Sequence, residues 1–250
     1  MRRASAFNIR LGESPFFFVS DHAGKLFPES LGNLGLAQKD QERHIAYDLG
    51  IREVGSVLAD RLKATLVEQN FSRLVIDCNR QPERKDIIPE ISDGTIIPAN
   101  LNLSKKERAW RHKKIFQPYH QKISELLEER ISQKKPTFFV SLHSFTPKLK
   151  TDAFKRPWEI GLLFNHDAES ASIFKEILFR KNDSLCIGEN KPYSLDLEKE
   201  YTVPTHAGNR KISALEIEIR QDFLQSEKSF IFITELLYQS FIMMQKMLWR

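Results

Sequence analysis

Side chains that can bind a metal ion or transfer a proton follow several short apolar segments of this sequence. The clusters are Asp21-His22-Ala23-Gly24, Asp77-Cys78-Asn79-Arg80, His143-Ser144-Phe145-Thr146, Asn165-His166-Asp167 and Glu218-Ile219-Arg220-Gln221-Asp222. If the apolar segments are strands, each cluster lies at the carboxyl end of a strand, where open α/β sheets bind their ligands. The pattern therefore predicts that side chains distant in sequence converge on one site.

Two histidines follow segments of buried-strand type, where a rigid backbone can hold an imidazole in fixed geometry. These are His22 and His143. A helical pattern over 38–49 adds His44 and Asp48, four residues apart and therefore on one helix face, as sources of a third ligand. Two imidazoles, one carboxylate and an open position make a catalytic zinc site. Because the sequence contains no HExxH motif, the alternative is that these histidines only make hydrogen bonds.

Two arginines are candidates for binding a substrate carboxylate. Arg80 ends the second cluster and Arg220 lies in the last one. A planar guanidinium matches a carboxylate with two parallel hydrogen bonds. The alternative is a structural ion pair, with Asp77 for the first arginine or Asp222 for the second.

Two carboxyl groups share one face of the last apolar segment, because residues two apart in a strand point the same way. Glu216 and Glu218 form this pair, and Glu218 is nearer the carboxyl end, where a general base for a nucleophilic water is needed. A silent ion pair between Glu218 and Arg220 is the alternative.

The elements that must position these residues alternate along the chain. Apolar segments of strand length lie at 15–19, 72–77, 137–142, 159–164 and 214–219. Segments with helical periodicity lie at 38–69, 104–134, 167–181 and 227–247. Alternation of this kind predicts an α/β fold with a largely parallel sheet flanked by helices. The segment 81–103 is expected to be a functional loop.

Composition narrows the class of protein. Lys and Arg number 38 against 33 Asp and Glu, without a dense block of like charge, so we expect no nucleic-acid partner, and the excess can attract a small anionic substrate. Two cysteines are too few for a disulfide scaffold, which favours a cytoplasmic location. No apolar run reaches the roughly 20 residues that span a bilayer, so no membrane association is expected. No obligatory protein partner is evident either.

Taken together and in order, these segments resemble the N-formylglutamate amidohydrolase family essentially from end to end. The matching stretches are VSDHAG (19–24), RHIAYDLGI (43–51), SRLVIDCNR (72–80), SDGTIIPAN (92–100), PYH (118–120), SLHSFTP (141–147), RPWEIGLLFN (156–165), GENKPYS (188–194) and IEIRQDF (217–223). The resemblance implies one catalytic domain over residues 1–250. It also implies a mixed, mostly parallel sheet flanked by helices, as in zinc-dependent exopeptidases of the phosphorylase/hydrolase-like type.

The resemblance further implies a Zn²⁺-dependent amidohydrolase acting on a small anionic N-acyl amino acid, such as N-formyl-L-glutamate. His22, His143 and Asp48 are the expected metal ligands. Carboxypeptidases have a glutamate where this sequence has Lys25, so Glu29 and His44 compete with Asp48 as third ligand. The alternatives are a hydrolase of another N-acyl amino acid or peptide amide, and a non-catalytic protein that binds a small anion.

In the implied reaction, zinc activates the water and Glu218 accepts its proton. Asn79 and Arg80 resemble the pair that grips a terminal carboxylate, and Arg220 joins them as a substrate-binding candidate. His206, in PTHAGNR, is expected to line the pocket or to steady the oxyanion, or else to be a loop histidine without a role. Asp21 is expected to orient the ring of His22 or to cap its turn.

Overall fold

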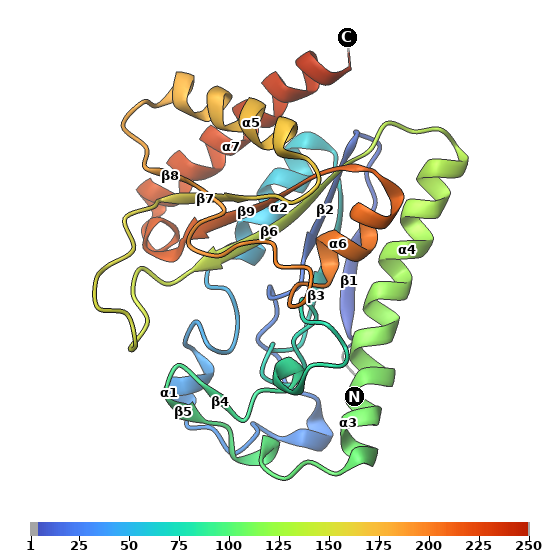
Figure 1. The fold of residues 1–250 in the computed structure, drawn as a ribbon, viewed down its shortest axis with the longest axis vertical. Coiled ribbons are helices and arrows are strands. Elements are labelled where there is room, and N and C mark those ends of the chain that lie inside the picture. The colour runs from blue at the N-terminus through green and yellow to red at the C-terminus, as the bar shows by residue number, and fades with distance from the viewer. Residues whose placement is uncertain (1–4, 250) are drawn as a thin grey trace.

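A seven-stranded sheet runs through the computed structural model, which describes residues 5–249 (Figure 1). The strand order is β1-β3-β2-β6-β9-β7-β8. The bounds are Phe7–Arg10 for β1, Phe16–Ser20 for β2, Thr65–Gln69 for β3, Phe138–Phe145 for β6, Ile160–Leu163 for β7, Ile187–Glu189 for β8 and Ser213–Arg220 for β9. Within this sheet, as described over residues 5–249, β1 pairs antiparallel with β3 and β7 with β9, and the other neighbouring strands pair parallel. The predicted mixed, mostly parallel sheet is therefore confirmed.

Helices cover both faces of this sheet. The helices α2 (Ile51–Leu62), α5 (Ala168–Lys181) and α7 (Glu227–Leu248) pack together on one face, whereas α4 (Gln117–Ser132) and α6 (Thr202–His206) lie on the other (Figure 1). This arrangement explains the continuous apolar run at the start of the chain. Alternate residues of β2 enter the two cores, Phe16 and Phe18 on the first side and Phe17 and Val19 on the second.

A long helical segment precedes the third apolar strand of the sequence. It consists of α3 (Lys105–Arg111), a π-helical turn (His112–Phe116) and α4. Ser104 begins it with a capping box, because its hydroxyl accepts from the Glu107 amide while the Glu107 carboxylate accepts from the Ser104 amide. The predicted helical segments 104–134, 167–181 and 227–247 are thus confirmed.

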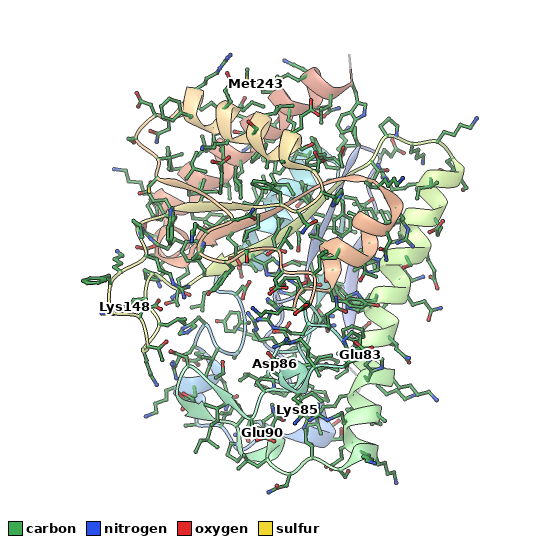
Figure 2. The ribbon with its side chains drawn as sticks, in the orientation of Figure 1. Glu83, Lys85, Asp86, Glu90, Lys148 and Met243 are labelled. Atoms are coloured by element: carbon green, nitrogen blue, oxygen red, sulfur yellow. The ribbon has the colours of Figure 1, made fainter. Side chains whose placement is uncertain are left out.

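The remaining elements are short and lie mostly in loops. They are α1 (Gln38–Gln41), the hairpin of β4 (Ile91–Ser92) and β5 (Thr95–Ile96), and 3-10 turns at Glu29–Leu31, Lys85–Ile87, Pro98–Asn100, Gly208–Arg210 and Gln221–Leu224. Figure 2 shows Asp86 and Glu90 in the layer of loops below the sheet. The predicted loop 81–103 therefore contains only this hairpin and single turns.

The predicted strand at 72–77 is wrong, because this segment folds as turns. Its apolar residues are buried, but the chain closes a turn in which the Val75 amide donates to Ser72 O at 2.9 Å. Buried side chains satisfy the carbonyls that a strand would have paired: Asn100 Nδ2 donates to Leu74 O at 2.8 Å and Arg111 Nη1 donates to Val75 O at 2.9 Å. The strand beside β2 is instead β3.

The continuous helical pattern predicted over 38–69 is also wrong. After α1 the chain runs through turns to Gly50, whose φ of 78° lies in the left-handed region, and α2 begins only at the next residue. Lys63, also left-handed at φ 52°, ends α2 before β3. His44 and Asp48 therefore do not share a helix face.

Within residues 5–249, no helix is long and apolar enough to cross a membrane. Both cysteines are free thiols, Cys78 buried and Cys186 exposed. The prediction of one domain over residues 1–250 includes positions 1–4 and 250, which lie outside the described residues, and it remains a prediction.

Candidate metal and active site

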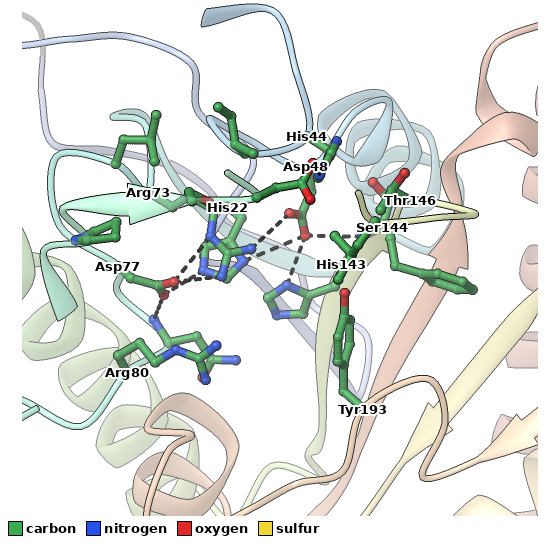
Figure 3. A pocket seen from close by; sticks show the side chains of 18 of the residues that line it. His22, His44, Asp48, Arg73, Asp77, Arg80, His143, Ser144, Thr146 and Tyr193 are labelled. Atoms are coloured by element: carbon green, nitrogen blue, oxygen red, sulfur yellow. Dashed lines mark hydrogen bonds and ion pairs between the residues drawn. The ribbon is translucent and has the colours of Figure 1, made fainter. Parts of the chain in front are cut away.

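Two histidines and an aspartate meet at the carboxyl edge of the sheet (Figure 3). His143 lies near the end of β6, and His22 follows the adjacent parallel strand β2. Asp48 comes from the turn before α2, and its amide donates to His22 O at 2.9 Å, which fixes this turn to the end of β2. The three side chains are buried, and their candidate ligand atoms all lie within 4.8 Å of one another. The structure thus brings together the three residues expected to bind metal.

The orientation of the two imidazoles fits a metal ion. Both Nδ1 atoms face Asp48 Oδ2, at 3.0 Å from His143 and 3.6 Å from His22. The His22 Nδ1 atom is buried and has no hydrogen-bond partner within the described chain. The Nε2 atoms, on the opposite side of each ring, make hydrogen bonds. His22 Nε2 lies 2.7 Å from Asp77 Oδ1, and His143 Nε2 lies 3.0 Å from Ser141 Oγ. Metal-binding histidines are typically anchored through their second nitrogen in this way.

Asp48 and the neighbouring Asp77 are held in the ionised form. Burial opposes ionisation, but the imidazoles of His22 and His143 keep the pKa of Asp48 below its usual value. Burial likewise opposes ionisation of Asp77, yet Arg73 and His22 hold the pKa of that carboxyl well below its usual range. The site therefore presents anionic oxygen next to imidazole nitrogen, a donor set suited to zinc.

Arg73 connects the two aspartates, a contact that sequence reasoning missed. Its Nε and Nη2 donate to Asp77 Oδ2 at 3.1 and 2.6 Å, and its Nη1 lies 3.5 Å from Asp48 Oδ1. The predicted strand 72–77 includes this arginine and gives it no chemical role. Its position four residues before Asp77, within an otherwise apolar run, is the signal that could have found it.

Asp21 does not orient His22, contrary to one of the two roles expected for it. Its Oδ1 accepts from Thr202 Oγ1 at 2.9 Å, and its Oδ2 lies 3.5 Å from both Ser141 Oγ and His143 Nε2. In the turn after β2, Asp21 contacts Ser141 and His143 of the neighbouring strand β6, and Asp77 holds His22 instead.

A cavity of about 450 Å³ opens beside this group. Its wall combines the ends of β6 and β9 with the β4–β5 hairpin and the loop that follows β6. The two loops are joined where the Lys150 amide donates to Asp93 Oδ1 at 2.8 Å. The cavity is thus covered by loops and floored by the sheet edge.

Glu218 lines the cavity and is the register partner of His143 on the adjacent strand. Burial raises the pKa of Glu218 to about 8, and its Oε2 has no hydrogen-bond partner among residues 5–249. Glu216 lies two residues earlier on the same face, with its Oε2 3.9 Å from His143 Nε2. Burial raises the pKa of Glu216 to about 8 as well. Two carboxyl groups that can exchange protons near neutral pH therefore face the cavity.

Asn79 and Arg80 also line the cavity. Asn79 Oδ1 accepts from the amides of Thr202 at 3.0 Å and Tyr201 at 3.3 Å, at the start of α6, so only its amide N–H groups can be offered to a substrate. Arg80 Nη1 lies 2.9 Å from Glu200 Oε1. Figure 3 shows Arg80 beside Asp77.

His206, expected at the pocket, does not line the cavity. Only 1% of it is exposed, and its Nε2 lies 2.9 Å from His120 Nδ1 while its Nδ1 contacts Ser124 Oγ at 3.4 Å. The short helix α6 turns this histidine toward α4 and the second core, away from the sheet edge.

Arg220, the other expected substrate-binding residue, also lies outside the cavity lining. Its Nη1 donates to the carbonyls of Arg156, Pro157 and Trp158 at 3.2, 3.0 and 3.3 Å, and its Nε donates to Asp222 Oδ1 at 2.8 Å. The guanidinium is committed to the backbone of the segment before β7, which explains why it does not reach a substrate.

The competitors of Asp48 for the third ligand lie outside the metal group. Glu29 is exposed on a 3-10 turn, and His44 lines the cavity with its Nε2 3.4 Å from Asp93 Oδ2. His44 and Asp48 lie in turns and share no helix face, contrary to the prediction, but Asp48 reaches the two histidines from its turn.

Comparisons with known proteins agree with this architecture. A family model described as N-formylglutamate amidohydrolase matches residues 14–224. The structure is similar to that of the gene product Atu2144 from Agrobacterium tumefaciens, with a TM-score of 0.92 and 30% identity over 99% of this chain and 97% of that chain. It is also similar in fold to N-formylglutamate amidohydrolase from Ralstonia eutropha JMP134, with a TM-score of 0.74 and 18% identity over 95% and 96% of the two chains. No curated protein is a significant match.

Proposed function

The chain belongs to the N-formylglutamate amidohydrolase family, and from this membership we propose that it is a metal-dependent hydrolase that cleaves the amide bond of an N-acyl amino acid. N-formyl-L-glutamate is the family's substrate by name and the first to test. The observation that carries the proposal is the placement of Glu218 beside the buried group of His22, Asp48 and His143 in one cavity.

The metal group is the first part of the proposal. A Zn²⁺ ion bound by His22, Asp48 and His143 would supply Lewis acidity toward the acyl oxygen and toward a nucleophilic water. Asp77 and Ser141 hold the outer nitrogens of the two rings, so that both Nδ1 atoms keep facing Asp48.

Proton transfer is assigned to Glu218. Its Oε2, which has no other partner among residues 5–249, accepts a proton from the attacking water and then delivers it to the leaving amine. A carboxyl group whose pKa burial raises to about 8 can carry out both steps near neutral pH.

Substrate binding is assigned to Arg80 and Asn79, which offer N–H donors to a carboxylate. Arg73 contacts Asp48 and Asp77 and adds positive charge beside the metal group, which would stabilise negative charge that develops on the acyl oxygen. His206 and Arg220 take no part, because neither lines the cavity.

A turnover screen of N-acyl amino acids with Zn²⁺-loaded protein tests the proposal. We expect hydrolysis of at least one substrate, and a loss of about 10²- to 10⁴-fold in kcat for Glu218→Gln at unchanged metal content. Glu13→Gln, an exposed glutamate outside the cavity, is the matched control. Tight binding without any turnover would support a non-catalytic anion-binding protein instead, and hydrolysis restricted to peptides would support a peptide amidase. Zinc as the bound metal and the cytoplasmic location remain predictions.

A further inference from the structure

An ion pair inside the cavity is not explained by the proposed chemistry. Arg80 Nη1 and Glu200 Oε1 lie 2.9 Å apart, and both side chains line the cavity, with 26% and 14% of their side-chain surfaces exposed. Glu200 stands just before α6 and 120 residues from Arg80 in sequence. The pair places one negative and one positive group side by side at the position assigned to a substrate carboxylate.

Both members of the pair keep free hydrogen-bonding capacity. Within the described chain, the contact between them is the only hydrogen bond of either charged group. Glu200 Oε2 is therefore available as an acceptor, and Arg80 retains its Nε and Nη2 donors. A silent structural pair typically has its remaining lone pairs and protons satisfied by neighbours, whereas this one presents them to the cavity.

Outside the proposed metal site, the described lining of the cavity offers no unpaired lysine or arginine for a second carboxylate. Among its described lining residues there is no lysine, and the two arginines, Arg73 and Arg80, are both paired with acids. A substrate with two carboxylates, such as N-formylglutamate, would bring a second negative charge into a cavity whose described lining has no unpaired lysine or arginine to bind it. Burying an unpaired charge is costly. The paired charges of Arg80 and Glu200 therefore favour a substrate whose group at this position carries no net charge.

We infer that the Arg80–Glu200 pair recognises a zwitterion, a carboxylate and an ammonium on the same carbon, and that the substrate is an α-amino acid acylated on its side-chain amine. Arg80 binds the carboxylate and Glu200 binds the ammonium. An Nα-acyl amino acid has lost that ammonium to the amide, and it leaves Glu200 with Arg80 as its single ionic partner within the described chain. The inference rests on the proposed function and names the substrate class of the same site.

The reaction on this class is balanced by water alone. The side-chain amide C–N bond breaks, the oxygen of water joins the acyl carbon to give a carboxylic acid, and the amine leaves with the proton from Glu218. The products are formate or another short carboxylate and a free diamino acid.

A pair of isomers separates the two classes of substrate. Nε-formyl-L-lysine and Nα-formyl-L-lysine have the same atoms and the same net charge, and only the first carries an ammonium beside its carboxylate. Titration calorimetry with Zn²⁺-loaded Glu218→Gln, in which hydrolysis is suppressed, is expected to show at least tenfold tighter binding of the Nε isomer, or of its shorter homologues Nδ-formyl-L-ornithine and Nγ-formyl-L-diaminobutyrate. When Glu200→Gln is added to this variant, the preference is expected to disappear. The control Glu198→Gln, exposed and two residues earlier, should keep the preference when it is added instead.

The outcomes distinguish this inference from the proposed function. Equal or tighter binding of the Nα isomer, or a preference that survives Glu200→Gln in a variant with unchanged Tm, would overturn the inference. Hydrolysis of N-formyl-L-glutamate together with weaker binding of every side-chain isomer would support the proposed function and overturn the zwitterion inference. Tighter binding of the side-chain isomers without hydrolysis of any compound would support the zwitterion site and reject the hydrolase.

Discussion

His143 on β6 and Glu218 on β9 are register partners in adjacent parallel strands, so their side chains leave the sheet on the same face. Three successive rows cross these strands on that face: Phe139 with Ala214, then Ser141 with Glu216, then His143 with Glu218. The first row belongs to the second core, and the other two belong to the cavity or support it. His143 and Glu218 therefore lie on the same sheet face as the second core, and the packing of that core fixes the strands that carry them.

The contact of Asp77 with His22 predicts an effect on metal affinity. Asp77→Asn keeps the side-chain shape but removes the charge that anchors Nε2 of His22, so we expect Zn²⁺ affinity to fall about 10- to 100-fold. Competition with a chromogenic chelator measures it. Asp86→Asn, which changes an acid of the same cavity paired with Arg84, is the control and should bind Zn²⁺ like the wild type. Equal affinities of all three proteins would show that Asp77 does not support a ligand.

The two arginines expected to bind substrate should respond differently to mutation. Arg80→Gln is expected to raise KM with little change in Tm, because this side chain faces the cavity. Arg220→Gln is expected to lower Tm at unchanged KM, because three backbone carbonyls lose their donor, a loss of about 1–3 kcal/mol in the free energy of unfolding. The assignment would be reversed by a rise in KM for Arg220→Gln at the Tm of the wild type.

The buried pair of His120 and His206 predicts loss of stability in mild acid. Burial lowers the pKa of His120 to about 4 and that of His206 well below its usual value, although Asp21 opposes both shifts. The unfolded chain protonates these rings near pH 6.5, so between about pH 6.5 and 4 it binds more protons than the folded chain. The contribution of these rings to the free energy of unfolding is therefore fully present above this pH window. It falls as the pH decreases through the window, by up to about 1.4 kcal/mol per pH unit for each ring.

Urea unfolding at several pH values checks this dependence. His120→Gln is expected to flatten it, whereas His166→Gln, which changes an exposed histidine, should follow the wild type. The same pH slope in His120→Gln and wild type would mean that the pair does not cause the acid sensitivity.

Several strands were predictable because each is buried on both faces and is therefore a run of mostly apolar residues. β2, β6 and β9 have apolar side chains on the face covered by α2, α5 and α7, and their polar ends follow directly, which is why His22, His143 and Glu218 could be placed at one sheet edge. β3 was missed because Glu68 and Gln69 interrupt its apolar pattern and only Lys63 and Ala64 separate it from α2.

The polar contacts between loops could not be predicted from the sequence. Segment 72–77 looks like a strand because Leu74, Val75 and Ile76 form an apolar run. These residues are indeed buried, but side chains from distant elements satisfy the carbonyls of Leu74 and Val75. The pairing of Arg80 with Glu200 likewise depends on how the segment before α6 folds back, which no local pattern encodes.

Metal analysis of the purified protein tests the central claim most directly. Elemental analysis after Zn²⁺ loading and gel filtration is expected to find about one ion per chain in the wild type and in the surface variant Glu13→Gln. His143→Ala, with folding checked by circular dichroism, is expected to lose the ion because one of the three ligands is gone. A wild type that retains no metal, and whose amide hydrolysis is unaffected by a chelator, would contradict the account.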